Sequence, residues 1–188
     1  MRKGRAWCVA MAIAAAAMLG RADAQTTPAQ NWPAKPIRII VPYPPGGLSD
    51  VFARLIGDKL ARVLRQSVVI DNRPGGNTII GTQATAQAAP DGYTLLLTNG
   101  ALSINQSLVA NLPYDLDRDL APAATPRPVI DKLNAAVNEV LRDPDTIARG
   151  RTLGLRIGGG PPEQLNEIMA KVTQIYAKVI KSANIKPD

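Results

Sequence analysis

The sequence contains 188 residues, carries a formal net charge of +7, and has one cysteine and no histidine. The lack of histidine excludes Ser-His catalytic triads and histidine-containing metal sites, and the stretch "GGLSD" lacks the Gly-x-Ser-x-Gly pattern of an esterase nucleophile. Aromatic residues make up only 4% of the chain, so few rings are available on which nucleic-acid bases could stack. We therefore expect no catalytic residue, no metal site, no cofactor and no nucleic-acid partner.

Residues 1–24 have the pattern of a secretory signal peptide. Basic residues precede an apolar stretch from Ala6 to Leu19, and Ala22-x-Ala24 then matches the small-residue cleavage pattern, with cleavage expected before Gln25. The apolar stretch is shorter than the roughly 18 residues of a membrane span, although an uncleaved anchor is the alternative. Because the sole cysteine, Cys8, lies in this segment, the exported chain would have no disulfide, which favours the periplasm.

The next part of the chain alternates between strand and helix patterns. Short apolar runs rich in β-branched residues alternate with segments of helical spacing, in the order strand 37–41, helix 48–64, strand 67–70, helix 78–88 and strand 93–98. This order predicts an α/β fold with parallel strands and right-handed crossovers. Ligands of such sheets bind beyond the carboxyl ends of the strands.

The loop "VPYPPGGLSD", residues 41–50, lies at one of these carboxyl ends. Gly46 and Gly47 would let the backbone approach a ligand closely, and Ser49 is expected to cap the following helix, whose N–H groups and dipole attract anions. Asp50 would occupy the first helical turn, where a carboxylate is favoured by the dipole. The same residues also suit a simple strand-to-helix turn, and the sequence alone leaves both interpretations open.

Two further loops are expected at the same edge of the sheet. Residues 71–81 follow the second strand and residues 98–108 follow the third, and both are rich in glycine, asparagine and short hydroxyl residues. Each could be an ordinary turn, but three such loops at one edge favour a binding site. Arg73 is ranked below the backbone amides as a ligand contact.

The C-terminal third contains two apolar stripes at helical spacing, which we interpret as core faces of helices that cover the sheet. Gly150 is expected to interrupt the helix that begins at Pro144, because glycine costs about 1 kcal/mol relative to alanine in a helix. The last helix would begin at Pro161-Pro162 without a serine or threonine cap. The stripes comprise Val129, Ile130, Leu133, Val137, Val140 and Leu141, and Leu165, Ile168, Met169, Val172, Ile175, Tyr176, Val179 and Ile180.

Several long motifs, in order, resemble those of one protein family. They are "WPAKPIRIIVPYPPGGLSDVFARLIGDKL", "VVIDNRPGGN", "AAPDGYTLLLTNGALSINQSL" and "LPYDLDRDLAP", followed by "AATPRPVIDKLNAAVNEVLRDP" and "GGGPPEQLNEIMAKVTQIYAKVIKSANIKPD". Together they are similar to the Bug proteins, the TctC-type solute receptors of tripartite tricarboxylate transporters. The resemblance extends from Trp32 over nearly all of the remaining chain.

The resemblance implies a periplasmic-binding-protein-like lobe of type II that binds a small carboxylate, such as a di- or tricarboxylate, and presents it to membrane transporter subunits. In this family the loop after the first strand holds a carboxyl group through backbone amides and bridging waters. The corresponding ligand-binding positions in this chain are Tyr43, Pro45, Gly46, Gly47, Ser49 and Asp50, with Thr98, Asn99 and Gly100 from the loop after the third strand.

The sequence also departs from the family pattern. Family members have a second lobe between the "DLAP" segment and the next helix, whereas here Pro122 is followed directly by Ala123. We therefore expect a signal peptide (1–24), an α/β ligand-binding lobe (25–122) and a helical segment that completes the same lobe (123–188), with the second lobe largely missing. A truncated interaction module or a nonfunctional remnant without tight solute binding is the alternative, and self-association through the exposed inter-lobe face is also left open.

Overall fold

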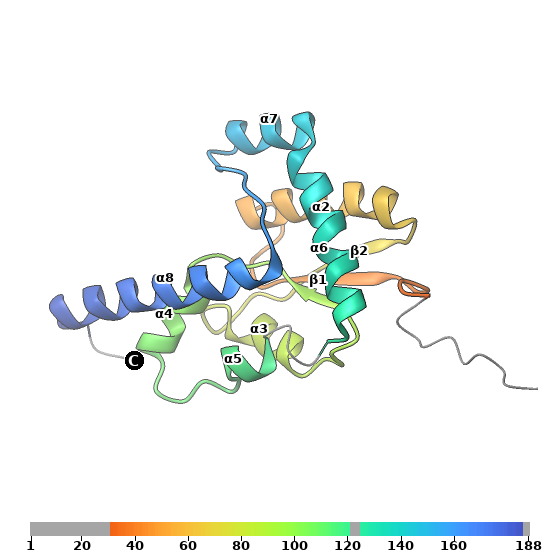
Figure 1. Cartoon of the computed structure of the whole chain (residues 1–188). Coiled ribbons are helices and arrows are strands. Elements are labelled where there is room, and N and C mark those ends of the chain that lie inside the picture. The colour runs from red at the N-terminus through yellow and green to blue at the C-terminus, as the bar shows by residue number, and fades with distance from the viewer. Residues whose placement is uncertain (1–30, 121–124, 186–188) are drawn as a thin grey trace, which may run out of the picture. The chain divides into compact units, whose positions relative to one another are not determined.

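The computed structural model describes residues 31–120 and 125–185, and within these ranges it contains three strands and seven helices (Figure 1). The predicted signal peptide and the predicted boundary between residues 122 and 123 lie outside the described residues. The domain limits therefore stay predictions. Residues from Trp32 onward group into one compact unit. No helix in the described part of the chain has the length and apolar character of a membrane span.

The strands form one parallel sheet in the order β2-β1-β3. The central strand β1 (Ile37–Val41) pairs with β2 (Val68–Asn72) on one side and with β3 (Thr94–Leu96) on the other. The β1 side chains of Ile37, Ile40 and Val41 are at most 1% exposed, because helices cover both faces of this strand. The prediction of an α/β fold with a parallel sheet flanked by helices is confirmed.

Helices α2 (Leu48–Leu64) and α3 (Ile79–Ala86) lie on opposite sides of the sheet (Figure 1). The strand order requires this arrangement, because the β1–β2 and β2–β3 crossovers run in opposite directions along the sheet and both are expected to be right-handed. Gly57 lets α2 approach β2 closely, since a Cβ at this position would lie 3.0 Å from Cδ1 of Ile70.

Helix α6 (Arg127–Arg142) packs on the outer side of α2 and buries Val129, Ala136 and Val140. Helix α7 (Pro144–Thr152) follows directly, with the Asp143 side chain accepting a hydrogen bond from the Thr146 N–H at 2.9 Å as its cap. The apolar stripe predicted for residues 129–141 therefore does form a core face.

The remaining helices are α4 (Ala101–Leu108), α5 (Leu116–Asp119) and α8 (Pro162–Ser182). Helix α8 lies beside α4 (Figure 1). Its N-cap, Pro161, makes no side-chain hydrogen bond, as the sequence predicts. The prediction that its apolar stripe is a core face is wrong, because none of the residues of α8 is buried.

Two local predictions are also wrong. Ser49 does not cap α2: the helix begins at Leu48 with Gly47 as its N-cap, and no side chain makes the cap hydrogen bond. Gly150 does not interrupt a helix, because α7 continues through it. A Cβ at Gly150 would lie 2.6 Å from the Ile157 side chain, so glycine lets the following segment pack against the helix, and this contact outweighs its low helix propensity.

Candidate functional site

The loop between β1 and α2 is held by the carboxylate of Asp50, which is only 3% exposed. Gly46, in the left-handed conformation with φ +81°, donates its N–H to Oδ2 of Asp50 at 2.8 Å. Asn72, at the end of β2, donates its amide to Oδ1 of Asp50 at 3.0 Å and to the Tyr43 carbonyl at 3.2 Å. Asp50 therefore ties the loop after β1 to the end of β2.

The negative charge of Asp50 is balanced within the same helix. Arg54, one turn further along α2, donates from Nε to Oδ2 at 3.1 Å and lies 2.9 Å from Oδ1 through Nη2. The hydrogen bonds from Arg54, and then from the Gly46 N–H, hold the pKa of Asp50 at about 2. Asp50 is thus charged at neutral pH, but its charge is compensated and its oxygens are occupied.

The backbone N–H groups of the three residues after Gly46 have surroundings different from those of the Gly46 N–H. The first helical hydrogen bond runs from the Val51 N–H to the Gly47 carbonyl at 2.9 Å. Among the described residues, the N–H groups of Gly47, Leu48 and Ser49 meet no protein acceptor. These amides lie at the positive end of the α2 dipole, where an anion is favoured. Residues Pro44 to Leu48 are exposed, so a solute can reach them.

The loop after β3 joins the loop after β1 through Tyr43. The Tyr43 hydroxyl donates to Oδ1 of Asn99 at 2.6 Å and lies 3.5 Å from Oγ1 of Thr98. Oδ1 of Asn99 also accepts the Ala101 N–H at 2.9 Å, which fixes the start of α4. A Cβ at Gly100 would lie 3.1 Å from the Tyr176 hydroxyl, so the absence of a side chain there allows α8 to approach.

The loop after β2 is held by α4. The fully buried Asn105 accepts a hydrogen bond from Nδ2 of Asn77 at 2.8 Å and donates to the Asn77 carbonyl at 2.8 Å. Asn77 and Thr78 both have positive φ, at 50° and 75°, so this reciprocal pair supports a strained turn. Arg73 forms an ion pair with Asp71, with 2.9 Å between Nε and Oδ2.

The structure places the predicted site residues in two adjoining loops. Tyr43 lies against Thr98 and Asn99, while Pro45, Gly46 and Gly47 form the exposed turn and Ser49 is half-buried beside them. Asp50 faces the interior of the loop instead of solvent. No ligand role is tested by this geometry, so the ligand-binding assignment stays a prediction.

Two residues that organise these loops were missed by sequence reasoning. Arg54 was not singled out as a site residue, although its position four residues after Asp50 is an ion-pair spacing that could have identified it. Asn72 lies in the "DNRPGG" motif, but the sequence does not indicate that its amide reaches Asp50 and Tyr43.

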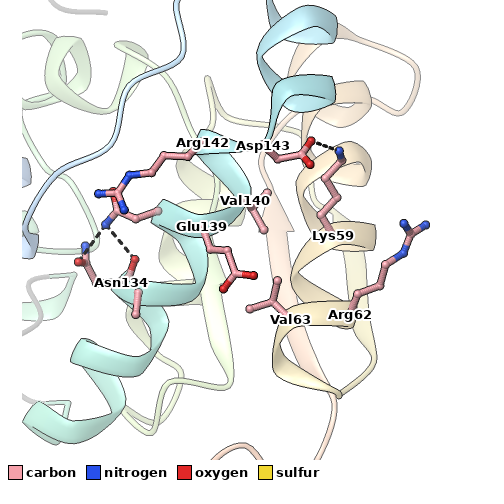
Figure 2. Close-up of a pocket in the computed structure, with 10 residues that line it drawn as sticks. Lys59, Arg62, Val63, Asn134, Glu139, Val140, Arg142 and Asp143 are labelled. Carbon is pink, nitrogen blue, oxygen red and sulfur yellow. Dashed lines mark hydrogen bonds and ion pairs between the residues drawn. The ribbon is translucent and has the colours of Figure 1, made fainter.

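The cavities that the structure shows lie elsewhere. One, of about 800 Å³, opens between α2 and α6 and is lined by Lys59, Arg62, Glu139 and Arg142, among others (Figure 2). Figure 2 shows the Lys59 amine directed at the Asp143 carboxylate. This ion pair, together with Asp145 at 2.9 Å, raises the pKa of Lys59. A second cavity, of about 440 Å³, opens between α2 and α7, and neither is lined by the predicted site residues.

Comparison with known proteins identifies relatives. The model of the tripartite tricarboxylate transporter family receptor, TctC, matches residues 52–121. A UPF0065 protein of Bordetella bronchiseptica is 48% identical over 97 residues, which are 51% of this chain and 29% of that protein. The protein BugT of Bordetella pertussis is 39% identical over 133 residues, which are 64% of this chain and 41% of that protein. The chain is therefore related to the TctC receptor family.

Several solved structures have a similar fold. The periplasmic binding protein BugD aligns with a TM-score of 0.75 at 17% identity, over 84% of this chain and 100% of that chain. MatC from Rhodopseudomonas palustris with bound malate aligns with a TM-score of 0.71 at 16% identity, over 79% of this chain and 100% of that chain. An R. palustris protein with adipate aligns with a TM-score of 0.66 at 16% identity, over 84% of this chain and 100% of that chain. These alignments show the fold.

The chain spans less than half the length of the curated relatives that it matches. The activity of a whole TctC receptor therefore does not transfer to it directly.

Proposed function

We propose that this chain binds a small carboxylate at the loop between β1 and α2, as the solute-binding component of a tripartite tricarboxylate transporter system. The observation that carries the proposal is the group of three consecutive backbone amides, at Gly47, Leu48 and Ser49, that meet no acceptor among the described residues at an exposed helix N-terminus. Binding through amides requires no catalytic residue, and the family is described as a receptor.

Electrostatics support the choice of an anion. Asp50 would repel a carboxylate if its charge were not compensated, but Arg54 contacts both of its oxygens. The loop is thereby left with the partial positive charge of the helix N-terminus. Tyr43, Thr98 and Asn99 add hydroxyl and amide groups beside the amides, and these can hydrogen-bond a ligand directly or through water.

The relatives support the solute class and the location. Two structural neighbours contain malate and adipate, both dicarboxylates, and another is a periplasmic binding protein. We propose a di- or tricarboxylate as the ligand, the periplasm as the location, and membrane subunits of the transporter as partners. Residues 1–24 would direct export as a cleaved signal peptide.

A second function is favoured by one observation. Residues Pro44 to Leu48 are exposed, and neither cavity described above includes them. Such a site would stay hydrated, and water would compete for its amides. The alternative is an interaction module that contacts a transporter or partner protein and does not bind solute tightly.

Affinity separates the two functions. If a two-lobed receptor holds its ligand near micromolar, about −8 kcal/mol, and each lobe contributes half, one lobe retains roughly −4 kcal/mol, a millimolar site. At about 10 mM ligand such a site would stabilise the chain by about 1.4 kcal/mol and raise Tm by roughly 3–6 °C.

The experiment is a thermal melt of the exported chain with malate, adipate and citrate, at constant ionic strength. Dimethyl adipate, which has the same carbon chain without charge, is the matched control. A Tm increase with adipate and none with its diester supports carboxylate binding. A cooperative melt that no carboxylate changes contradicts it and favours the interaction module.

A further inference from the structure

Asn99 and Gly100 form the single Asn-Gly pair in the sequence. They lie in the loop between β3 and α4, where Asn99 is exposed and Gly100 is half-buried. Because glycine has no side chain, its backbone nitrogen can approach the side-chain carbon Cγ of a preceding asparagine with little hindrance. Deamidation of asparagine begins with this approach, so the pair is a candidate modification site.

The surroundings of Asn99 favour an attack on its Cγ. Oδ1 of Asn99 accepts two hydrogen bonds, from the Tyr43 hydroxyl at 2.6 Å and from the Ala101 N–H at 2.9 Å. Donors to a carbonyl oxygen stabilise the negative charge that develops on this oxygen when a nucleophile adds to its carbon. Among the described residues, the Gly100 N–H meets no acceptor, so no hydrogen bond has to break before this amide reacts.

We propose that Asn99 is a site of spontaneous deamidation and that Tyr43 promotes the reaction. The Gly100 nitrogen loses its proton to a solvent base and forms a bond to Cγ of Asn99. The bond between Cγ and Nδ2 then breaks, and Nδ2 takes up a proton and leaves as ammonia. Water opens the resulting succinimide at either of its carbonyls, which gives aspartate or isoaspartate. The net reaction consumes one water and releases one ammonia, and it requires no oxidant or cofactor.

The effect of this modification on function rests on the carboxylate site proposed above. Aspartate at position 99 would keep both hydrogen bonds, because a carboxylate oxygen accepts from a hydroxyl and an N–H as the amide oxygen does. It would also place a negative charge in the loop that Tyr43 joins to the loop of the free amides. Isoaspartate would add the same charge and insert Cβ into the backbone just before α4. Both products should therefore weaken the binding of a carboxylate.

Asn77 provides an internal comparison at the same edge of the sheet. It is also exposed, but it precedes Thr78, whose branched side chain hinders attack by the backbone nitrogen. Its Nδ2 is held by Oδ1 of the buried Asn105 at 2.8 Å. Exposure alone would make Asn77 and Asn99 equally reactive, whereas the proposed mechanism requires Asn99 to react much faster.

Peptide mass spectrometry after incubation of the folded, exported chain in mildly alkaline buffer tests the modification. Asn99 should convert before Asn77, and the rate should rise with pH because the Gly100 amide must lose a proton. Tyr43→Phe should slow the conversion at least about threefold, because it removes one donor to Oδ1. Tyr176→Phe is the matched control: Tyr176 lies beside Gly100, and its hydroxyl makes no hydrogen bond to Asn99 in the described part of the chain.

The same measurement in concentrated urea separates the folded contact from the dipeptide itself. Unfolding removes the contact between Tyr43 and Asn99, so the wild type and Tyr43→Phe should then react at the same rate. The proposal is overturned if Asn77 converts as fast as Asn99 in the folded chain. It is also overturned if Tyr43→Phe reacts as fast as Tyr176→Phe in the folded chain.

Calorimetric titration with malate and adipate tests the effect on binding. Asn99→Asp should bind at least about threefold more weakly than the wild type, and added salt should reduce the difference. Asn166→Asp is the matched control, because it adds the same charge at an exposed position of α8. Equal affinity of Asn99→Asp and the wild type overturns the effect on binding. A wild type that binds no carboxylate contradicts the proposed function instead, while the mass measurement still decides whether Asn99 is modified.

Discussion

Replacing Gly47 by valine separates carboxylate binding from folding. Gly47 is the N-cap of α2, and its own N–H is one of the three amides without an acceptor among the described residues. A branched side chain at this position would stand over the approach to the amides of Leu48 and Ser49. Because the effect is steric, it does not change the charge of the loop.

The structure indicates that the protein will tolerate this change. Gly47 has φ −74° and ψ 169°, an extended conformation that valine adopts readily. A Cβ at this position would have the Pro44 carbonyl as its nearest neighbour, at 3.5 Å, which is an ordinary contact. We therefore expect the free energy of unfolding to change by less than about 1 kcal/mol.

Affinity should respond much more strongly. A ligand that loses two of its amide contacts should bind at least tenfold more weakly, which is about 1.4 kcal/mol. Calorimetric titration with malate and adipate measures this loss, and urea denaturation measures stability in parallel. Gly158→Val is the matched control, since Gly158 has open space around it in a different loop. Carboxylate affinity that is the same in both variants would place the site elsewhere and refute the assignment of the amides.

Three further predictions concern folding and export. Gly92→Ala should destabilise the protein by at least about 2 kcal/mol in urea denaturation, because Gly92 has φ +79° and its new Cβ would overlap Val129, whereas Gly158→Ala should have little effect. Asp50→Asn should lower Tm at pH 7. The pKa of Asp50 is depressed from 3.8 to about 2, so the charged carboxylate stabilises the fold above about pH 4. The Tm difference between this variant and the wild type should therefore disappear as the pH falls through about 2. N-terminal sequencing of the exported chain should begin at Gln25, and material that begins at Met1 would contradict the signal-peptide assignment.

The order and type of the first five elements could be predicted from the sequence because each has a local signal. β-Branched apolar runs identified β1 and β2, and the apolar spacing of α2 distinguished it from a strand. The boundaries were less accurate: β2 begins and ends later than predicted, at Val68 and Asn72, and β3 is confined to Thr94–Leu96. Strand ends depend on pairing with β1, and this pairing is not a local property of the sequence.

The organisation of the candidate site depends on contacts between distant residues. The sequence predicted that the loops after β1 and β3 lie at one edge of the sheet, but not that Tyr43 would contact Asn99. It placed Asp50 in the first turn of α2 for its interaction with the dipole. It did not indicate that Gly46, Arg54 and Asn72 would all bind this carboxylate. Gly46 and Arg54 each lie four residues from Asp50, whereas the contact of Asn72 with Asp50 depends on the pairing of β2 with β1, which is not a local property of the sequence.

Helices α6 and α8 show why apolar spacing alone could not predict what covers a helix face. In α6, Val129, Leu133, Ala136 and Val140 recur at steps of four, three and four, and the stripe of α8 has the same kind of spacing. Val140 is 2% exposed where α6 packs against α2, and Val129 is 3% exposed beside Gly92, whereas α8 meets α4 on a neighbouring face. An apolar stripe indicates that burial of that helix face would be favourable, but it does not specify the partner that buries it. For α6 that partner is another helix of the same chain, α2.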